Sequence, residues 1–167
     1  MSRLSWKLSA VGLAVVFGLL VTPTANAAAT PSSGVTQTVH YQGGNCQLKS
    51  DTPHWSWRAG TVLFKTRVEC IGTSAPTVRI TGTMNYSLAG LPGSPTTGDL
   101  RTVATSSQDQ VVPIGKTATY YTPMRNTNTL VAPGTYQGVA TGEVIAPQHS
   151  NLTTEPTQRV YVAPVAG

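Results

Sequence analysis

The chain has 167 residues, and only 10% of them are charged, well below the roughly 25% of a typical globular protein. It contains 26 Thr, 16 Gly and 12 Pro residues, so it is rich in strand and turn formers and poor in helix formers. This composition excludes a helical bundle, a coiled coil and a charge-rich disordered tail.

The N-terminus has the pattern of a Sec-type secretory signal. Arg3 and Lys7 make its start positive, an apolar run covers residues 8–21, and Ala-Asn-Ala at 25–27 has the small-x-small form of a cleavage site. The apolar run is short for a spanning helix. We therefore predict that residues 1–27 are a cleaved signal peptide.

The predicted signal peptide determines where the mature domain begins and indicates the compartment in which it folds. Residues 28–34 are small and polar and are predicted to form a flexible leader, and residues 35–167 to form a single domain. No other apolar run is long enough to remain as an integral membrane segment. The pattern is typical of a bacterial protein that is secreted or held in the cell envelope.

The two cysteines, Cys46 and Cys70, are predicted to form a disulfide. An exported chain folds in an oxidising compartment, where an even number of cysteines indicates pairing. Their separation matches no zinc-binding spacing. Closing this loop stabilises the folded state by about 3.5 kcal/mol in the chain-entropy model.

Seven segments with strand character alternate with turns rich in Gly, Pro and Asn. In the clearest one, Val78, Ile80 and Met84 share one face while polar side chains occupy the other, which is typical of an antiparallel sheet with one face buried. The sequence predicts an all-β antiparallel sandwich, with a small closed barrel as the alternative. The predicted strands cover residues 35–41, 61–70, 77–88, 99–106, 116–122, 135–145 and 157–163.

The stretch Ala132-Pro133-Gly134-Thr135-Tyr136 places a Tyr after a tight turn at the start of a long strand. It resembles the tyrosine corner of immunoglobulin-like sandwiches, whose hydroxyl bonds back to the backbone. The resemblance implies an immunoglobulin-like sandwich of about seven strands with one disulfide. In immunoglobulins the disulfide joins the two sheets across a long sequence gap, whereas the shorter gap here predicts an early strand or loop pinned to its neighbour.

The segment His-Trp-Ser-Trp-Arg at 54–58 is the candidate binding site. Trp55 and Trp57 are the only Trp residues after the signal, and in an extended chain they project to the same side. Parallel aromatic faces stack on sugar rings, while Arg58, His54 and Asp51 offer hydrogen bonds to hydroxyls. Alternatively, one or both Trp rings fill the core. The predicted binding residues are Trp55, Trp57, Arg58 and His54.

The remaining polar residues give no sign of catalysis, of a metal or of a nucleic-acid partner. There is no Gly-x-Ser-x-Gly motif, and the disulfide removes both thiols. His40, His54 and His149 lack the i, i+2 or i, i+4 spacing of a metal pair. The nine basic residues left after cleavage form no cluster along the sequence. We expect no enzymatic activity and no cofactor.

These observations favour a secreted, non-catalytic binding protein whose ligand is a cell-envelope polysaccharide or peptidoglycan. The alternatives are a protein-directed effector, such as an inhibitor or an antibacterial factor, and a structural protein of the envelope. The Pro-stiffened loop at 90–98 has the form of an inhibitory loop, although most such loops are surface connections. The partner is thus cell-wall carbohydrate or an extracellular protein.

Overall fold

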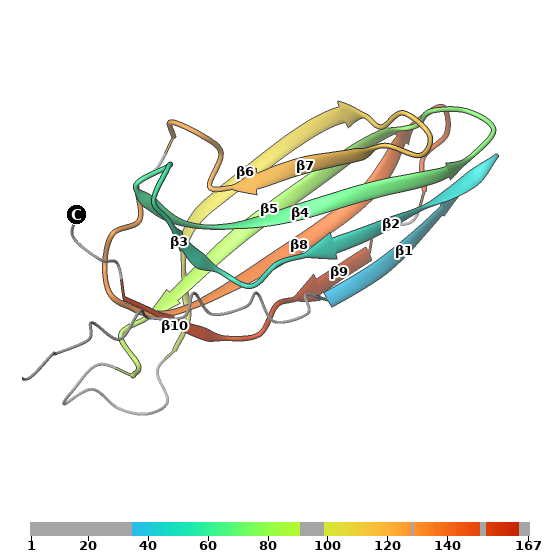
Figure 1. Cartoon of the computed structure of the whole chain (residues 1–167). Coiled ribbons are helices and arrows are strands. Elements are labelled where there is room, and N and C mark those ends of the chain that lie inside the picture. Colours follow the sequence, from blue (N-terminus) through green and yellow to red (C-terminus); the bar gives the residue numbers. More distant parts are fainter. Residues whose placement is uncertain (1–34, 91–98, 128, 151–152, 164–167) are drawn as a thin grey trace, which may run out of the picture.

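The computed structural model describes residues 35–90, 99–127, 129–150 and 153–163. Within these ranges ten strands form two five-stranded antiparallel sheets that face each other as a β-sandwich, and there is no helix (Figure 1). The predicted signal peptide, leader and most of the loop at 90–98 lie outside them. The strands are β1 Val35–Tyr41, β2 Gly44–Ser50, β3 His54–Ser56, β4 Thr61–Gly72, β5 Thr77–Ser87, β6 Arg101–Val111, β7 Thr117–Thr122, β8 Gly134–Ala146, β9 Thr153–Pro156 and β10 Val160–Val162.

The first sheet is built around the long strand β4. β2 pairs with its C-terminal part and β3 with its first residues, so both lie along one side of it. β7 pairs with the middle of β4 and takes the opposite side, since β2 and β7 share partners from Thr66 to Glu69. β1 completes the sheet by pairing with β2 along its whole length.

The second sheet has the order β10-β8-β5-β6, and β9 pairs with β8 on the same side as β10. β5 pairs with β6 and β8 over nearly its full length, which makes it the central strand. The separation into two packed sheets identifies a sandwich and excludes the closed barrel.

Inward-facing side chains of both sheets form two core clusters. The first surrounds the disulfide and includes Leu48 and Ile80, and the second includes Phe64 and Tyr136. Gly138 permits the close approach of the sheets at the second cluster, because a Cβ there would lie 2.8 Å from the Phe64 ring. Burial of these apolar side chains supplies most of the free energy that favours folding.

The predicted disulfide is present and lies inside one sheet. Cys46 and Cys70 are directly opposite each other in the β2–β4 pair, with Cα atoms 4.0 Å apart, and both are fully buried. A short Cα separation marks the non-hydrogen-bonded positions of an antiparallel pair. The bond therefore pins an early strand to its neighbour, as predicted.

The tyrosine corner is also confirmed. The hydroxyl of Tyr136 donates to the carbonyl oxygen of Ala132 at 2.7 Å, and that of Tyr86 donates to Pro133 O at 3.0 Å. The two rings pack with centroids 5.0 Å apart. Burial raises the pKa of Tyr136 to about 12. These contacts fix the chain where it enters β8.

Side chains of β6 close one side of the sandwich. Ser106 Oγ and Gln108 Nε2 donate to Tyr121 O at 3.1 and 2.8 Å, and Gln110 Nε2 donates to Thr119 O at 3.2 Å. These bonds satisfy carbonyl groups on the outer edge of β7, where an unpaired strand would invite pairing with another chain.

Each of the seven predicted segments overlaps a strand, although several bounds differ. The structure adds β2, β3 and β9, which the sequence analysis did not predict, so the sandwich has ten strands within the described residues rather than about seven.

Candidate functional site

The predicted binding segment forms β3 and the turn that leads into β4. His54 and Trp55 pair with Leu63 and Val62 of β4. The backbone N–H of Gly60 donates to Ser56 O at 2.8 Å, and Gly60 has a φ of 61°, which favours glycine. The segment is thus extended through Ser56 and then reverses direction.

The two Trp residues do not form a parallel platform. Their ring planes meet at 84° with centroids 6.4 Å apart, an edge-to-face contact. Trp55 packs against the second core cluster, as the core alternative anticipated for at least one ring, whereas Trp57 is 64% exposed. The Trp55 Nε1 atom is buried and has no hydrogen-bond partner among the described residues. The expectation of parallel sugar-stacking faces is therefore wrong.

The other polar residues of the segment have separate environments. His54 is half-buried, and its Nδ1 donates to the carbonyl oxygen of Thr52 at 3.0 Å. Asp51 is buried and accepts a hydrogen bond from Arg67 Nη1 at 2.7 Å. Only Arg58 of the four predicted residues lines a groove described below.

This groove of about 390 Å³ lies on the outer face of the first sheet, near the start of β4. Leu63 and Lys65 face outward because they alternate with the core residues Val62 and Phe64. Tyr121 of β7 forms the adjacent wall, and Lys65 and Tyr121 are direct partners in the β4–β7 register. The β3–β4 turn and the connection from β7 to β8 form the remaining walls, with Ser56, Arg58, Ala59, Pro123, Met124, Arg125, Asn126 and Thr129.

Three cations line the groove, and none of the described residues that line it is Asp or Glu. Tyr121 holds two of them. The guanidinium of Arg125 lies 4.6 Å from the ring centroid, and its Nη2 donates to the Tyr121 hydroxyl at 3.1 Å. Lys65 Nζ lies 5.9 Å from the same centroid. Arg58 supplies the third positive charge.

A tight turn carries Arg125. The Thr127 hydroxyl donates to Met124 O at 2.6 Å, the backbone N–H of Thr127 lies 3.3 Å from the same oxygen, and Asn126 has a left-handed φ of 63°. Arg125 is therefore positioned by its own turn as well as by Tyr121.

After residue 27, the excess of basic over acidic residues lies on the first sheet and its connections, and three of these basic residues, Arg58, Lys65 and Arg125, line the groove. The first sheet and the connections around the groove carry five basic and two acidic residues, a net charge of +3. The other four basic and four acidic residues cancel. The sequence shows no basic cluster, yet the fold brings Arg58, Lys65 and Arg125 together. The seven residues are Lys49, Asp51, Arg58, Lys65, Arg67, Glu69 and Arg125.

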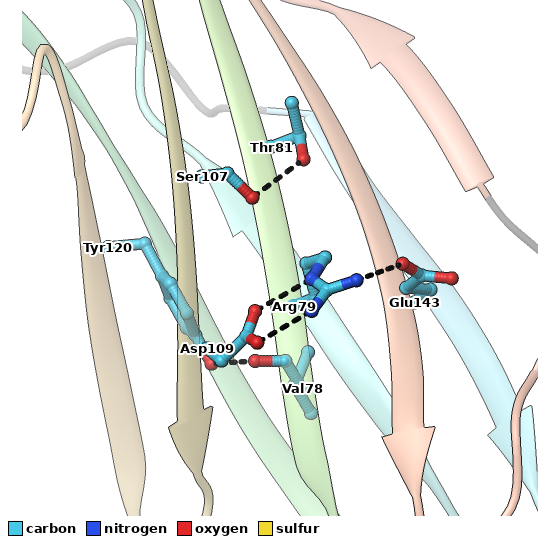
Figure 2. Close-up of polar contacts among 7 residues, drawn as sticks. All are labelled: Val78, Arg79, Thr81, Ser107, Asp109, Tyr120 and Glu143. Carbon is cyan, nitrogen blue, oxygen red and sulfur yellow. Dashed lines mark hydrogen bonds and ion pairs between the residues drawn. The ribbon is translucent and has the colours of Figure 1, made fainter.

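A cluster on the outer face of the second sheet differs from the groove, because its cation is paired with carboxylates (Figure 2). Arg79 lies between Asp109, with contacts of 2.7 and 2.8 Å, and Glu143 at 3.7 Å. The hydrogen bond from Arg79 lowers the pKa of Asp109 and raises that of Arg79. Thr81 and Ser107 bond to each other at 3.3 Å in the next row. Within this cluster Arg79 is paired with two carboxylates, and the two hydroxyl groups bond to each other.

The described residues contain no group of three or more His, Cys, Asp and Glu that could hold a metal ion. Nor do they include a helix that is long and apolar enough to cross a membrane. No protein-family model matches the chain, and no curated protein matches it.

Proposed function

We propose that this protein is a secreted, non-catalytic binding protein that recognises an anionic polysaccharide of the cell envelope. The observation that carries the proposal is the groove on the first sheet, where Arg58, Lys65 and Arg125 converge and the described lining residues include no carboxylate. Such a site favours a ligand that brings negative charge, since like charges held together repel until an anion binds.

The chemistry of the groove also suits a sugar polymer. Guanidinium groups donate two parallel hydrogen bonds to a carboxylate or phosphate, and an ammonium adds a point charge. Ser56 and Asn126 supply further polar groups for sugar hydroxyls. The intermediate exposure of Tyr121 and its contacts with two cations make it the residue that positions them.

Binding is tested by co-sedimentation of the oxidised protein with insoluble anionic envelope polysaccharide. Lys65→Ala and Arg125→Ala are each expected to weaken binding about tenfold or more, because each removes a charge-assisted hydrogen bond. Added salt is expected to weaken wild-type binding, because it screens exposed charges.

Lys116→Ala is the matched control. Lys116 is exposed in the β6–β7 turn, so this variant removes the same charge away from the groove lining. It is expected to bind like the wild type. Equal losses in all three variants would mean that net charge alone attracts the polymer, and no wild-type binding would refute the proposal.

A further inference from the structure

The end of the sandwich beside the groove exposes large apolar side chains. Trp57 is 64% exposed, Val131 55% and Met124 42%. Trp57 lies in the β3–β4 turn, and the other two lie in the β7–β8 connection. The opposite end of the sandwich also exposes large apolar side chains, namely Ile71, Val111 and Ile114. What distinguishes the end beside the groove is the combination of exposed apolar side chains with the cations of the groove.

Backbone contacts bring these two connections together. Val62 N–H donates to Leu130 O at 2.8 Å, and Leu130 N–H donates to Thr61 Oγ1 at 2.7 Å, so Val131 follows a residue fixed to the start of β4. Met124 lines the same groove as Arg58 and Ala59, the residues that follow Trp57. Met124 therefore lines the cationic groove, while Trp57 directly precedes a lining residue and Val131 directly follows a residue bonded to the start of β4.

The second sheet also exposes apolar side chains at this end of the molecule. Phe64 and Val62 of early β4 share a core cluster with Tyr86 of late β5 and Tyr136 of early β8, so these strand ends lie at the same end of the sandwich (Figure 1). Leu88, just beyond β5, is 56% exposed, and Tyr161 of β10 is 45% exposed.

Apolar side chains beside cations match the chemistry of a lipid bilayer surface. Trp is enriched at the membrane interface, where one part of the ring is apolar and the other is wet. Lys and Arg near an anionic bilayer are each attracted to the headgroups, which strengthens binding about fivefold per cation. An apolar partner protein would not need the three unpaired charges.

We propose that this end of the sandwich docks on an anionic lipid bilayer. Trp57, Met124 and Val131 enter the interface, and the cations of the groove face the headgroup phosphates. This inference shares the groove cations with the proposed function but differs in its ligand, which is a lipid surface and not a polysaccharide.

Two kinds of vesicle test the docking: phosphatidylcholine alone, and phosphatidylcholine mixed with phosphatidylglycerol. The protein is expected to sediment with the mixed vesicles and not with the neutral ones. Its Trp fluorescence should then shift to the blue, because Trp57 leaves water while Trp55 is already packed against the core. Absence of sedimentation with the mixed vesicles would overturn the inference.

Variants separate the apolar contribution from the charge. Trp57→Ser and Val131→Ser are each expected to weaken vesicle binding at least about tenfold, through lost apolar burial. Ile71→Ser, at a residue 57% exposed beyond the core cluster that holds the disulfide, is the matched control and should bind normally. Vesicle binding that Trp57→Ser and Val131→Ser leave unchanged would refute docking through these side chains.

The two proposals fail in different ways. Val131→Ser is expected to retain wild-type polysaccharide binding, because Val131 does not line the groove. Binding of polysaccharide without vesicles would overturn the lipid inference alone. Binding of vesicles without polysaccharide would overturn the proposed function and support the lipid inference.

Discussion

Two groups of cations on the outer faces of the sandwich, Arg79 on the second sheet and Lys65 with Arg125 on the first, have different partners. On the outer face of the second sheet, Arg79 is neutralised by Asp109 and Glu143 from the strands on either side (Figure 2). On the first sheet, Lys65 and Arg125 share the ring of Tyr121 and have no carboxylate within 4.0 Å among the described residues. Charges that stabilise a sheet are paired within it, whereas unpaired cations held by a neutral ring are available to a ligand.

The sheets also differ in how they are held together. Each sheet contains a strand of three residues, β3 in the first and β10 in the second, but in the first sheet β2 is also joined to β4 by the disulfide. The second sheet has three strands of at least 11 residues, β5, β6 and β8, and depends on their long registers. The sheet that carries the groove is therefore the one in which a disulfide joins two strands.

Removal of the disulfide is expected to have the largest effect on the free energy of unfolding. Cys46→Ala combined with Cys70→Ala should lower the free energy of unfolding by about 3.5 kcal/mol, because the unfolded chain regains the entropy of an open loop. Urea denaturation measures the loss. Hydrogen exchange should show that amides of β1 and β2 lose protection before those of β5 and β8. Equal loss of protection in both sheets would contradict the difference between them.

Loss of a buried hydroxyl that connects the two sheets is expected to have the next-largest effect on the free energy of unfolding. Tyr120 of β7 donates to Val78 O of β5 at 2.9 Å. Tyr120→Phe should lower the free energy of unfolding at neutral pH by about 1 kcal/mol, since the carbonyl loses its partner. The urea midpoint reports this change. An unchanged midpoint would mean that the bond does not contribute to the association of the sheets.

The same residue predicts a loss of stability at alkaline pH. Burial raises the pKa of Tyr120 well above its ordinary value of 10.0, and that of Tyr136 to about 12. The folded state keeps protons that the unfolded state has lost, so stability is full below pH 10 and falls as pH rises above it. Tyr120→Phe should make this fall shallower, which urea denaturation at a series of alkaline pH values would measure. A slope identical to the wild type would contradict the assignment to Tyr120.

Local sequence patterns predict those parts of the fold that depend on residues close together in the sequence. The alternation of Val78, Ile80 and Met84 predicts β5, and the turn before Tyr136 predicts the tyrosine corner. β2 has only Cys46 and Leu48 as apolar inward-facing residues, and all four residues of β9 are at least partly exposed. These strands are stabilised by pairing, which no local pattern shows.

The groove depends on the register between strands that are distant in the sequence. It could therefore not be predicted from the order of residues along the chain. Arg58, Lys65 and Arg125 come from a turn, a strand and a connection, and only the pairing of Lys65 with Tyr121 brings them together. The expectation of parallel Trp rings failed for a related reason. Strict alternation requires an extended chain, but β3 ends at Ser56, so Trp57 lies in the turn and its ring is perpendicular to that of Trp55.

Removing the two carboxylates beside Arg79 tests whether an unpaired cation on the second sheet also attracts the polysaccharide. Of the changes considered, this one should have the smallest effect on binding. Asp109→Asn combined with Glu143→Gln adds two units of positive charge and leaves Arg79 without a carboxylate partner. If binding of the anionic polysaccharide needs converging cations, this variant should change affinity by less than about twofold at physiological salt, where exposed charges farther apart than about 8 Å are largely screened.

The matched measurement on the first sheet is Lys65→Ala, which removes one unit of charge and is expected to weaken binding about tenfold. A larger change in charge with a smaller change in affinity would show that the arrangement of the cations matters more than their number. A rise in affinity of the second-sheet variant comparable to the loss in Lys65→Ala would contradict this. Binding would then follow net charge, and the groove would have no special role in it.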